Sequence, residues 1–267
     1  MRAGIREEKG QVVPRRHLLL PDCQIRPGVD TKHIDWAAQA IIEYLPDVIV
    51  VIGDWWDLPS LNSHEMSGSK ELEGCRIKDE IDAGNEAFER LVAPLQNEQL
   101  RRELNRKKRY NPECHFLFGN HENRITRVTT QDPKWDGLLT LDALKTPGFR
   151  RHKFLEIVEL DGIKYCHYFP NPHSGKPIGG TIINRLNHIG SSFVQGHQQG
   201  FMYATKQYPD HVKHGLVAGR FYSHNENYRP ENVQACEWNG IIILNRVEAG
   251  DLDLMPMRYA YLQEKYS

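Results

Sequence analysis

The sequence predicts an α/β fold, and three observations in its first half carry that prediction. Residues 17–20 are a short apolar run and residues 47–52 a continuous β-branched run, both of the kind that form buried strands. Between them, over residues 34–45, apolar side chains recur at the spacing of one helical face. A third apolar run, residues 114–118, again ends at a glycine. Strand, helix and strand in succession indicate a βαβ unit, in which ligands collect at the carboxyl ends of the strands.

The elements of the first half have recognisable ends. Asp30 or Thr31 can cap the first helix, and Pro46 stops it. A long insertion then occupies residues 58–109. Its apolar residues between 77 and 95 predict a helix, with a kink at Pro94.

The second half reads as shorter strands. Residues 155–160 and 163–169 flank an Asp-Gly turn and predict a hairpin. Residues 169–180 are a loop by composition, and residues 192–195 form another strand. The remainder predicts further strands and a short tail. Because no repeat or linker interrupts the chain, we expect one domain over residues 1–267, with the helical insertion at about 58–109.

Composition narrows the classes of function. The 34 basic and 35 acidic side chains give a net charge of −1, so any nucleic-acid contact must come from a local patch. No stretch approaches the ~18 consecutive apolar residues of a membrane span, and the N-terminus lacks the apolar run of a secretory signal. We therefore expect a cytoplasmic protein without a membrane partner. Five cysteines without a CxxC pair predict free thiols.

Five apolar strands end in side chains that can bind a metal. A single Asp after a strand usually caps a turn, but strand ends gather at one edge of a sheet, so five in succession indicate a shared site. Carboxylate, amide oxygen and imidazole together suit Mn, Fe, Zn or similar ions. The residues are Asp22, Asp54, Asn120, His167 and His197.

The same residues stand in a recognisable order of motifs. The order resembles that of the calcineurin-like metallophosphoesterases over residues 18–244, and the GDxxD and GNHE motifs are its most specific part. The segments PDCQIRPG, SSFVQGHQQ and WNGIIILNRVEAGDLDLMPMRYAYL resemble sequences of the branch encoded by tailed bacteriophages. The resemblance implies a β-sandwich flanked by helices in four layers, α/β/β/α. The motifs are Asp22-x-Gln24, Gly53-Asp54-x-x-Asp57, Gly119-Asn120-His121-Glu122, His167 and Gly196-His197-x-Gln199.

The resemblance also implies two metal positions that share Asp54, and hence one or two divalent ions. One position consists of Asp54, Asn120, His167 and His197 and is complete. The other consists of Asp22, Asp54, Gln24 and Gln199, where the two Gln replace the family's usual His. Amide oxygen is a harder ligand than imidazole, so we expect this position to be weak, suited to Mn or Mg, or empty. Mn is the favoured metal, with Mg, Fe, Ni and Zn as alternatives.

The implied reaction is hydrolysis of a phosphoester by a metal-activated hydroxide, with two ions clamping the phosphate. His121 resembles the family's non-ligand His, which gives a proton or hydrogen bond to the leaving oxygen. Asp57, or alternatively Glu122, would orient His121 and raise its pKa. The plainer interpretations are a structural His beside a ligand and an Asp that only caps the next segment.

Several other residues are candidates for substrate contact, each with a plain alternative. Arg124 and Arg26 follow motifs and can bind phosphate or form surface salt bridges. The basic run at 101–109 can follow a nucleic-acid backbone or be a solvated helix end. Trp55 and Trp56 can stack on a base or pack in the core. Surface positions are favoured for His64, His173 and His224.

We interpret the chain as a metal-dependent phosphoesterase, with a phosphodiesterase or nuclease favoured. Protein phosphatases of the superfamily carry an Arg before GNHE and Arg-Gly after GDxxD, whereas this chain has Phe118 and Leu58-Pro59. The expected partner is a phosphoester, with DNA or RNA favoured. The alternatives are a nucleotide or other small phosphoester and a non-catalytic metal-binding scaffold. If the chain is phage-encoded, its place is the host cytoplasm.

Overall fold

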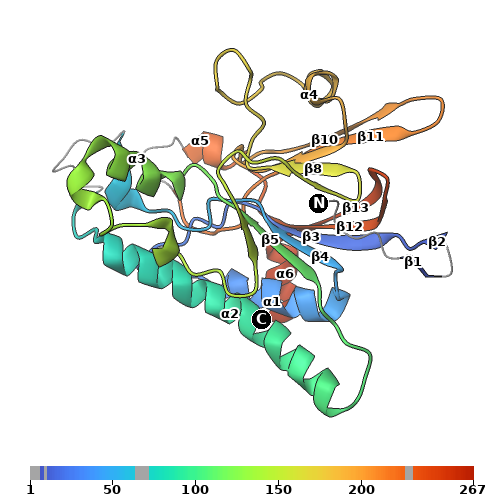
Figure 1. Cartoon of the computed structure of the whole chain (residues 1–267), viewed down its shortest axis with the longest axis horizontal. Helices are drawn as coiled ribbons and strands as arrows, with labels where there is room; N and C mark the ends of the chain where they lie inside the picture. Colours follow the sequence, from blue (N-terminus) through green and yellow to red (C-terminus); the bar gives the residue numbers. More distant parts are fainter. Residues whose placement is uncertain (1–6, 9–10, 64–71, 226–230) are drawn as a thin grey trace.

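Two β-sheets pack face to face at the centre of the protein, as the computed structural model shows for residues 7–8, 11–63, 72–225 and 231–267 (Figure 1). The six-stranded sheet contains β3 (Arg15–Leu20), β4 (Val48–Val51), β5 (Glu113–Leu117), β6 (Arg150–His152), β12 (Gly240–Glu248) and β13 (Asp251–Arg258). The five-stranded sheet contains β7 (Val158–Leu160), β8 (Ile163–Cys166), β9 (Phe193–Gln195), β10 (Phe201–Gln207) and β11 (Val212–Ala218). A separate pair, β1 (Glu7–Glu8) and β2 (Gln11–Val12), is antiparallel.

Strand order explains why the carboxyl ends meet. The sheets have the orders β13-β12-β3-β4-β5-β6 and β10-β11-β9-β8-β7. Neighbours from β3 to β6 run parallel, as do β8 with β9 and β9 with β11. Since parallel strands end at the same edge, the loops after them come together there.

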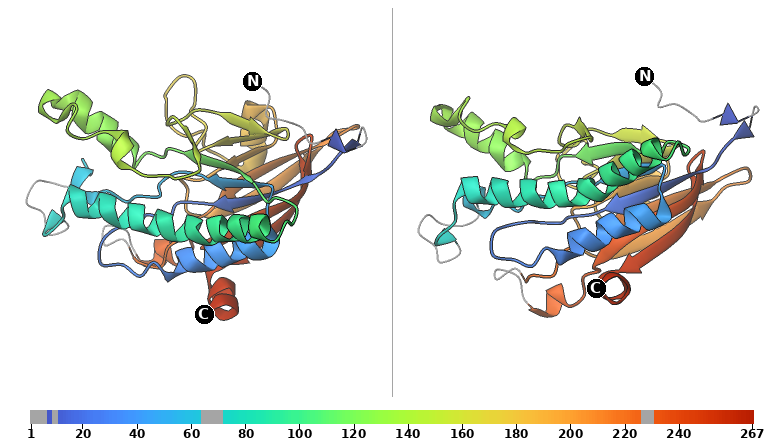
Figure 2. Two further views of the ribbon diagram at one scale, coloured as in Figure 1. Left: turned by 60° about the horizontal axis from the view of Figure 1, so that its bottom comes forward. Right: turned by 90° about the horizontal axis from the view of Figure 1, so that it is seen from below.

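Helices cover both outer faces. Figure 1 shows α1 (Lys32–Tyr44), α2 (Ile77–Leu104) and α6 (Tyr259–Tyr266) on one side of the strands and α4 (Ile182–Ile189) on the other. In Figure 2, α1 and α2 lie side by side. The remaining helices, which lie in connections, are α3 (Asn123–Gln131), α5 (Glu231–Gln234), η1 (Pro59–Leu61), η3 (Pro133–Trp135) and η4 (Leu141–Ala143).

Three apolar cores bind the four layers together. In β3, Leu18 and Leu20 pack toward the helices, whereas Leu19 packs between the sheets, so the strand must be apolar on both faces. A third core joins α4 to the five-stranded sheet through Ile182 and Phe193. The predicted α/β class and the four-layer α/β/β/α order are therefore confirmed.

The predicted element ends are largely confirmed. Helix α1 stops at Tyr44, followed by Leu45 in the left-handed region and then Pro46. Asp30 Oδ1 accepts a hydrogen bond from the Lys32 N–H at 2.9 Å, whereas the side chain of Thr31 makes no capping bond. Helix α2 fills much of the insertion and contains Pro94 within it.

The hairpin around Asp161-Gly162 is confirmed, although β7 begins only at Val158. The five cysteines are free, as expected. Among the described helices, none combines the length and apolar character required to cross a membrane.

Candidate metal centre

The predicted ligands lie just past the carboxyl ends of neighbouring strands. They come from both sheets, so the edge of the sandwich brings together residues far apart in sequence. Asp22 follows β3, Asp54 follows β4, Asn120 follows β5, His167 follows β8 and His197 follows β9.

Three of the predicted ligands have a strained backbone. Gln24, Asp54 and His197 are in the left-handed region, with φ of +42°, +50° and +63°. This region is unfavourable for residues with a Cβ, and such strain gathers at functional sites because the surrounding structure holds it in place. Three of the predicted ligands are therefore held in conformations that the isolated chain would avoid.

Two motif glycines let the carboxylates approach the backbone closely. A Cβ on Gly119 would lie 2.1 Å from Asp54 Oδ1, and a Cβ on Gly196 would lie 2.6 Å from Asp22 Oδ1. Any larger residue would displace the carboxylates. The glycines of GNHE and of the last motif therefore have a steric role in shaping the centre.

Four of the predicted ligands converge. One ligand atom each from Asp54, His167 and His197 lies within 4.8 Å of the others, so this group can hold a metal ion. Asn120 Oδ1 lies 2.9 Å from His167 Nε2 and 2.8 Å from His197 Nδ1. His167 Nδ1 is 2.8 Å from the carbonyl oxygen of Ile52, and donation there fixes Nε2 toward the centre.

The charges of these side chains shift one another's pKa values. Burial opposes protonation of His167, but the Asp54 carboxylate outweighs it and raises the pKa of His167 to about 9. Burial and then the charge of His167 lower the pKa of His197 to about 4. Burial also opposes ionisation of Asp54, yet His167 and His121 hold its pKa well below the usual range. The centre thus keeps Asp54 ionised and favours a cation beside it.

The other predicted position offers unpartnered oxygens. Asp22 Oδ1 accepts a hydrogen bond from the His197 N–H at 3.1 Å. Within the described chain, Asp22 Oδ2 and Gln24 Oε1 are buried without a hydrogen-bond partner. Buried oxygens are normally satisfied, and a hard cation would satisfy both. Burial, and then Asp54, raise the pKa of Asp22 to about 7.

Gln199 differs from Gln24. Its Oε1 accepts a hydrogen bond from the Tyr222 hydroxyl at 2.9 Å, and its carbonyl oxygen accepts from the Trp238 N–H. Gln199 lies on the same cavity as Gln24 and Asp54. Its amide is therefore already oriented by a neighbouring side chain.

The predicted general acid sits beside its predicted partner. His121 Nδ1 lies 2.8 Å from the carbonyl oxygen of Asp57 and 3.2 Å from Asp57 Oδ1. Arg124 Nη2 lies 3.1 Å from His121 Nε2, so Nε2 accepts in this arrangement. Burial opposes protonation of His121, but the Asp54 carboxylate overcomes it and raises the pKa of His121.

Glu122 does not orient His121, contrary to the alternative considered from sequence. Its carboxylate instead accepts backbone hydrogen bonds that tie the GDxxD and GNHE motifs together. The donors are the N–H groups of Asp54, Trp55, Trp56 and Gly119, at 2.7–3.1 Å.

Base stacking on Trp55 or Trp56 is excluded because both are fully buried. Their indole N–H groups donate to carbonyl oxygens of α2, Trp55 to Gly84 and Trp56 to Ile81. The tryptophans therefore anchor the long helix beneath the metal-binding loop.

Of the other residues considered for substrate contact, some lie where the sequence predicted and others do not. Arg26 pairs with Asp57 at 3.1 Å and does not line the cavity, whereas Arg124 does. His173 is exposed, as expected. His224 is half-buried and stacks on Tyr222 at 4.4 Å rather than lying on the surface. His64 lies outside the described residues.

The basic run lies at the wrong end of the sheet to reach this centre. It precedes β5, whereas Asn120 and His121 follow that strand. In Figure 1, helix α3 lies at one end of the strands, and the C-terminal end of α2 lies at the opposite end. Arg101 and Arg102 pair with Glu98 at 2.6 and 2.7 Å, and residues 106–109 are exposed. The solvated-surface interpretation is the better supported one.

A cavity of about 800 Å³ opens above the converging ligands. Besides the centre, its walls include Arg127 of α3, Arg185 of α4 and the aromatic pair Phe154 and Tyr168. Sequence reasoning missed these residues. The signals available were Arg127 three residues after Arg124 on one helix, and Tyr168 directly after His167.

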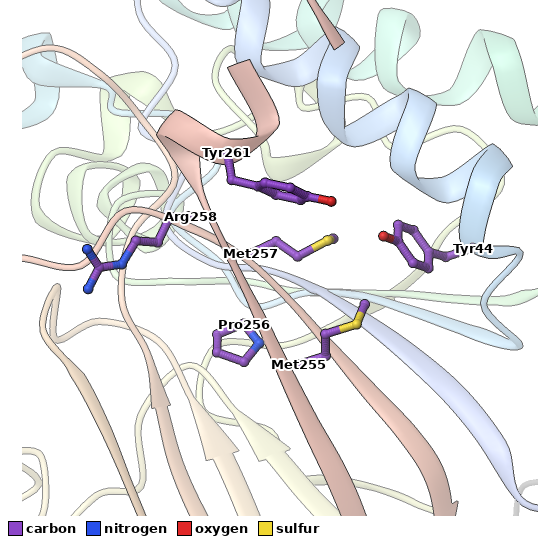
Figure 3. Close-up of a pocket in the computed structure, with 6 residues that line it drawn as sticks. All are labelled: Tyr44, Met255, Pro256, Met257, Arg258 and Tyr261. Atoms are coloured by element: carbon purple, nitrogen blue, oxygen red, sulfur yellow. The ribbon is translucent and has the colours of Figure 1, made fainter. Parts of the chain in front are cut away.

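A second cavity, of about 420 Å³, lies elsewhere, between the end of α1, β13 and α6 (Figure 3). Figure 3 shows the hydroxyls of Tyr44 and Tyr261 pointing toward each other beside Met255 and Met257, with Arg258 directed away. No carboxylate or imidazole lines it. It therefore offers no comparable chemistry.

Comparison with known proteins adds little to this geometry. No family model matches the sequence, and no curated protein matches it. Among solved structures, the chain is similar to a single mutant of Vps29 from Entamoeba histolytica. The match covers 91% of this chain and 99% of that chain, with 11% identity and a TM-score of 0.35. At this identity and TM-score, no property of that protein can be inferred for this chain.

Proposed function

We propose that this chain is a metal-dependent phosphoesterase, acting on phosphodiester bonds as a phosphodiesterase or nuclease, and that residues 1–267 form one domain. The observation that carries the proposal is the convergence of Asp54, His167 and His197 with the Asn120 oxygen. The buried, unpartnered oxygens of Asp22 and Gln24 beside it support a second, oxygen-rich position. The motif resemblance supports the same reaction class.

The residues fit divalent ions of the Mn type. Asp54, Asn120, His167 and His197 would hold one ion, and Asp22, Asp54 and Gln24 would contribute to the other, with Gln199 at its edge. Bound ions supply Lewis-acid activation of the phosphate and of water. Asp54, kept ionised by its neighbours, would serve both positions.

His121 would act on the leaving group. Hydrolysis consumes one water, breaks the bond between phosphorus and the leaving oxygen, and requires a proton on that oxygen. The raised pKa of His121 favours the imidazolium that can supply it, and Asp57 accepts the Nδ1 hydrogen bond that fixes the ring.

Arg124 would couple this step to binding. Its guanidinium now donates to His121 Nε2, which suits only the neutral ring. Protonation of Nε2 requires Arg124 Nη2 to move away, and a phosphate oxygen in the cavity is a stronger acceptor for it. Arg124 would thus bind substrate and release the acid together.

The test is metal content and turnover of bis(p-nitrophenyl) phosphate. The parent with Mn²⁺ should bind metal and hydrolyse the substrate, whereas Asp54→Asn and His167→Ala should lose both. A metal-loaded parent without any turnover over a phosphoester panel would favour the scaffold alternative. The matched control is Glu86→Ala, an exposed change on α2, which should behave as the parent does.

A further inference from the structure

Two arginines line the cavity, and no acidic side chain of the described residues pairs with either. Arg185 of α4 is only 3% exposed and donates to Gln198 Oε1 at 2.5 Å and to the carbonyl oxygen of Gly180 at 3.2 Å. Arg127 of α3 is half-buried and donates to the carbonyl oxygen of Leu61 at 2.7 Å. Within the described part of the chain, neither guanidinium meets a carboxylate.

Such uncompensated charges are costly. Neutral acceptors satisfy individual N–H groups but leave the positive charge without a counter-ion, which is unfavourable where water is partly excluded. Burial lowers the pKa of both arginines accordingly. By contrast, Arg26 and Arg124, near the same centre, both lie within 4.0 Å of a carboxylate oxygen of Asp57. Since no carboxylate of the described residues pairs with Arg127 or Arg185, each guanidinium can bind an anion that enters the cavity.

The two arginines belong to different sides of the centre. Arg127 follows Arg124 by three residues on α3, and Arg124 contacts His121. Arg185 is bonded to Gln198, the residue after His197. One arginine thus belongs to the side of the leaving-group donor and the other to the side of the metal-binding imidazoles. Phosphates on the two sides of one held at the metals could each approach one of these arginines.

The cavity also offers an aromatic surface. Phe154 and Tyr168 are half-buried and meet edge to face, with ring centroids 5.7 Å apart, and Tyr168 lies 4.8 Å from the ring of His197. A half-buried aromatic pair that lines a cavity can accept the flat face of a base. A volume of about 800 Å³ is that of a small-molecule pocket and has room for unpaired nucleotides.

We propose that the cavity binds an unpaired nucleic-acid strand, with the phosphates on either side of the scissile one at Arg127 and Arg185 and a base against Tyr168 and Phe154. This rests on the proposed phosphodiesterase function and names its substrate class. It assigns strand recognition to the cavity walls instead of the exposed basic run.

Kinetics on two substrates test the assignment. A short single-stranded oligothymidylate has flanking phosphates, whereas bis(p-nitrophenyl) phosphate has none. With Mn²⁺, Arg127→Gln and Arg185→Gln should each lower the ratio of kcat/KM for the oligonucleotide to that for the small diester by about 10- to 100-fold, the value of a charged hydrogen bond. Arg185→Lys, which keeps the charge, should lower this ratio less than Arg185→Gln does. Arg106→Gln, in the exposed run, is the matched control and should keep the parent's ratio.

Binding gives a second readout that does not require turnover. Fluorescence anisotropy with labelled oligothymidylate, in the slow His121→Ala background with Mn²⁺, measures affinity across salt concentrations. Each lost phosphate contact should reduce the slope of log affinity against log salt by about 0.7. A merely structural role for either arginine would weaken binding without changing this slope.

The outcomes separate the two proposals. If the small diester is hydrolysed while both arginine variants, folded by circular dichroism, keep the parent's ratio and slope, strand recognition is overturned and the phosphodiesterase function stands. If neither substrate is hydrolysed but strand binding depends on both arginines, the function is overturned and the binding assignment stands.

Discussion

Replacing Gly84 with Ala should destabilise the protein, although this substitution usually stabilises a helix. Gly84 lies within α2 beneath the GDxxD motif, and a Cβ there would lie 1.9 Å from Cδ1 and Nε1 of Trp56. Trp56 is fully buried, and its Nε1 donates to the carbonyl oxygen of Ile81 at 3.2 Å. A contact this close cannot be accommodated, so either the buried ring or the helix must shift.

The magnitude follows from three contributions. Ala in place of Gly gains about 1 kcal/mol of helix propensity. Overpacking costs about 1–3 kcal/mol, and loss of the Trp56 hydrogen bond costs about 1 kcal/mol more. The expected net loss of stability is about 2 kcal/mol. Because Trp56 lies between Asp54 and Asp57, the same shift should also weaken metal binding.

Urea unfolding of the apoprotein, followed by tryptophan fluorescence, measures the loss. Glu86→Ala and Glu86→Gly, at an exposed position of the same helix, provide the control, with Ala expected to be more stable than Gly by about 1 kcal/mol. If Gly84→Ala is as stable as the parent or more so, Trp56 is not packed as described, and its anchoring role is refuted.

Three further predictions concern acid stability, metal preference and catalysis. Burial lowers the pKa of His33 to about 3, so the unfolded chain takes up a proton first as the pH falls. His33 should therefore cost about 2 kcal/mol of stability between about pH 7 and about pH 5. Both ring nitrogens lack partners in the described chain, so His33→Phe should remove this loss in urea melts at the two pH values, and an unchanged loss would contradict it. Changing Gln24 and Gln199 together to His should shift metal preference toward Zn in competition titrations, and more than either single change does. An unchanged metal preference would mean that neither side chain faces an ion. His121→Ala should lower kcat by roughly 10²–10⁴-fold with Mn affinity nearly unchanged, and equal turnover of a substrate with a poor leaving group would exclude the acid role.

The sequence predicted the centre better than its surroundings. Asp54, Asn120, His167 and His197 could be placed together because each follows an apolar strand, and parallel strands end at one edge. The sequence did not place Arg127, Arg185 and Tyr168 on the cavity. Their position there depends on how α3, α4 and β8 pack.

Helices α3 and α4 were missed for a physical reason. Helix α3 buries only Ile125, so it has no apolar stripe of useful length. Helix α4 is short and follows a loop rich in Pro and Gly, which obscures its local signals, namely the Thr181 cap, the apolar spacing of Ile182, Leu186 and Ile189, and Gly190 at its end. The base-stacking hypothesis for Trp55 and Trp56 failed because local sequence does not show that the motif lies over α2.

The most direct test of the account is a crystal structure with limiting Mn²⁺, in which anomalous scattering measures the ion at each position. The account predicts a strong peak among Asp54, Asn120, His167 and His197 and a weaker peak, or none, between Asp22 and Gln24. The imidazole-rich set supplies the stronger ligands, whereas the other set relies on carboxylate and amide oxygen. Equal occupancy of the two positions, or no ion at either, would contradict it.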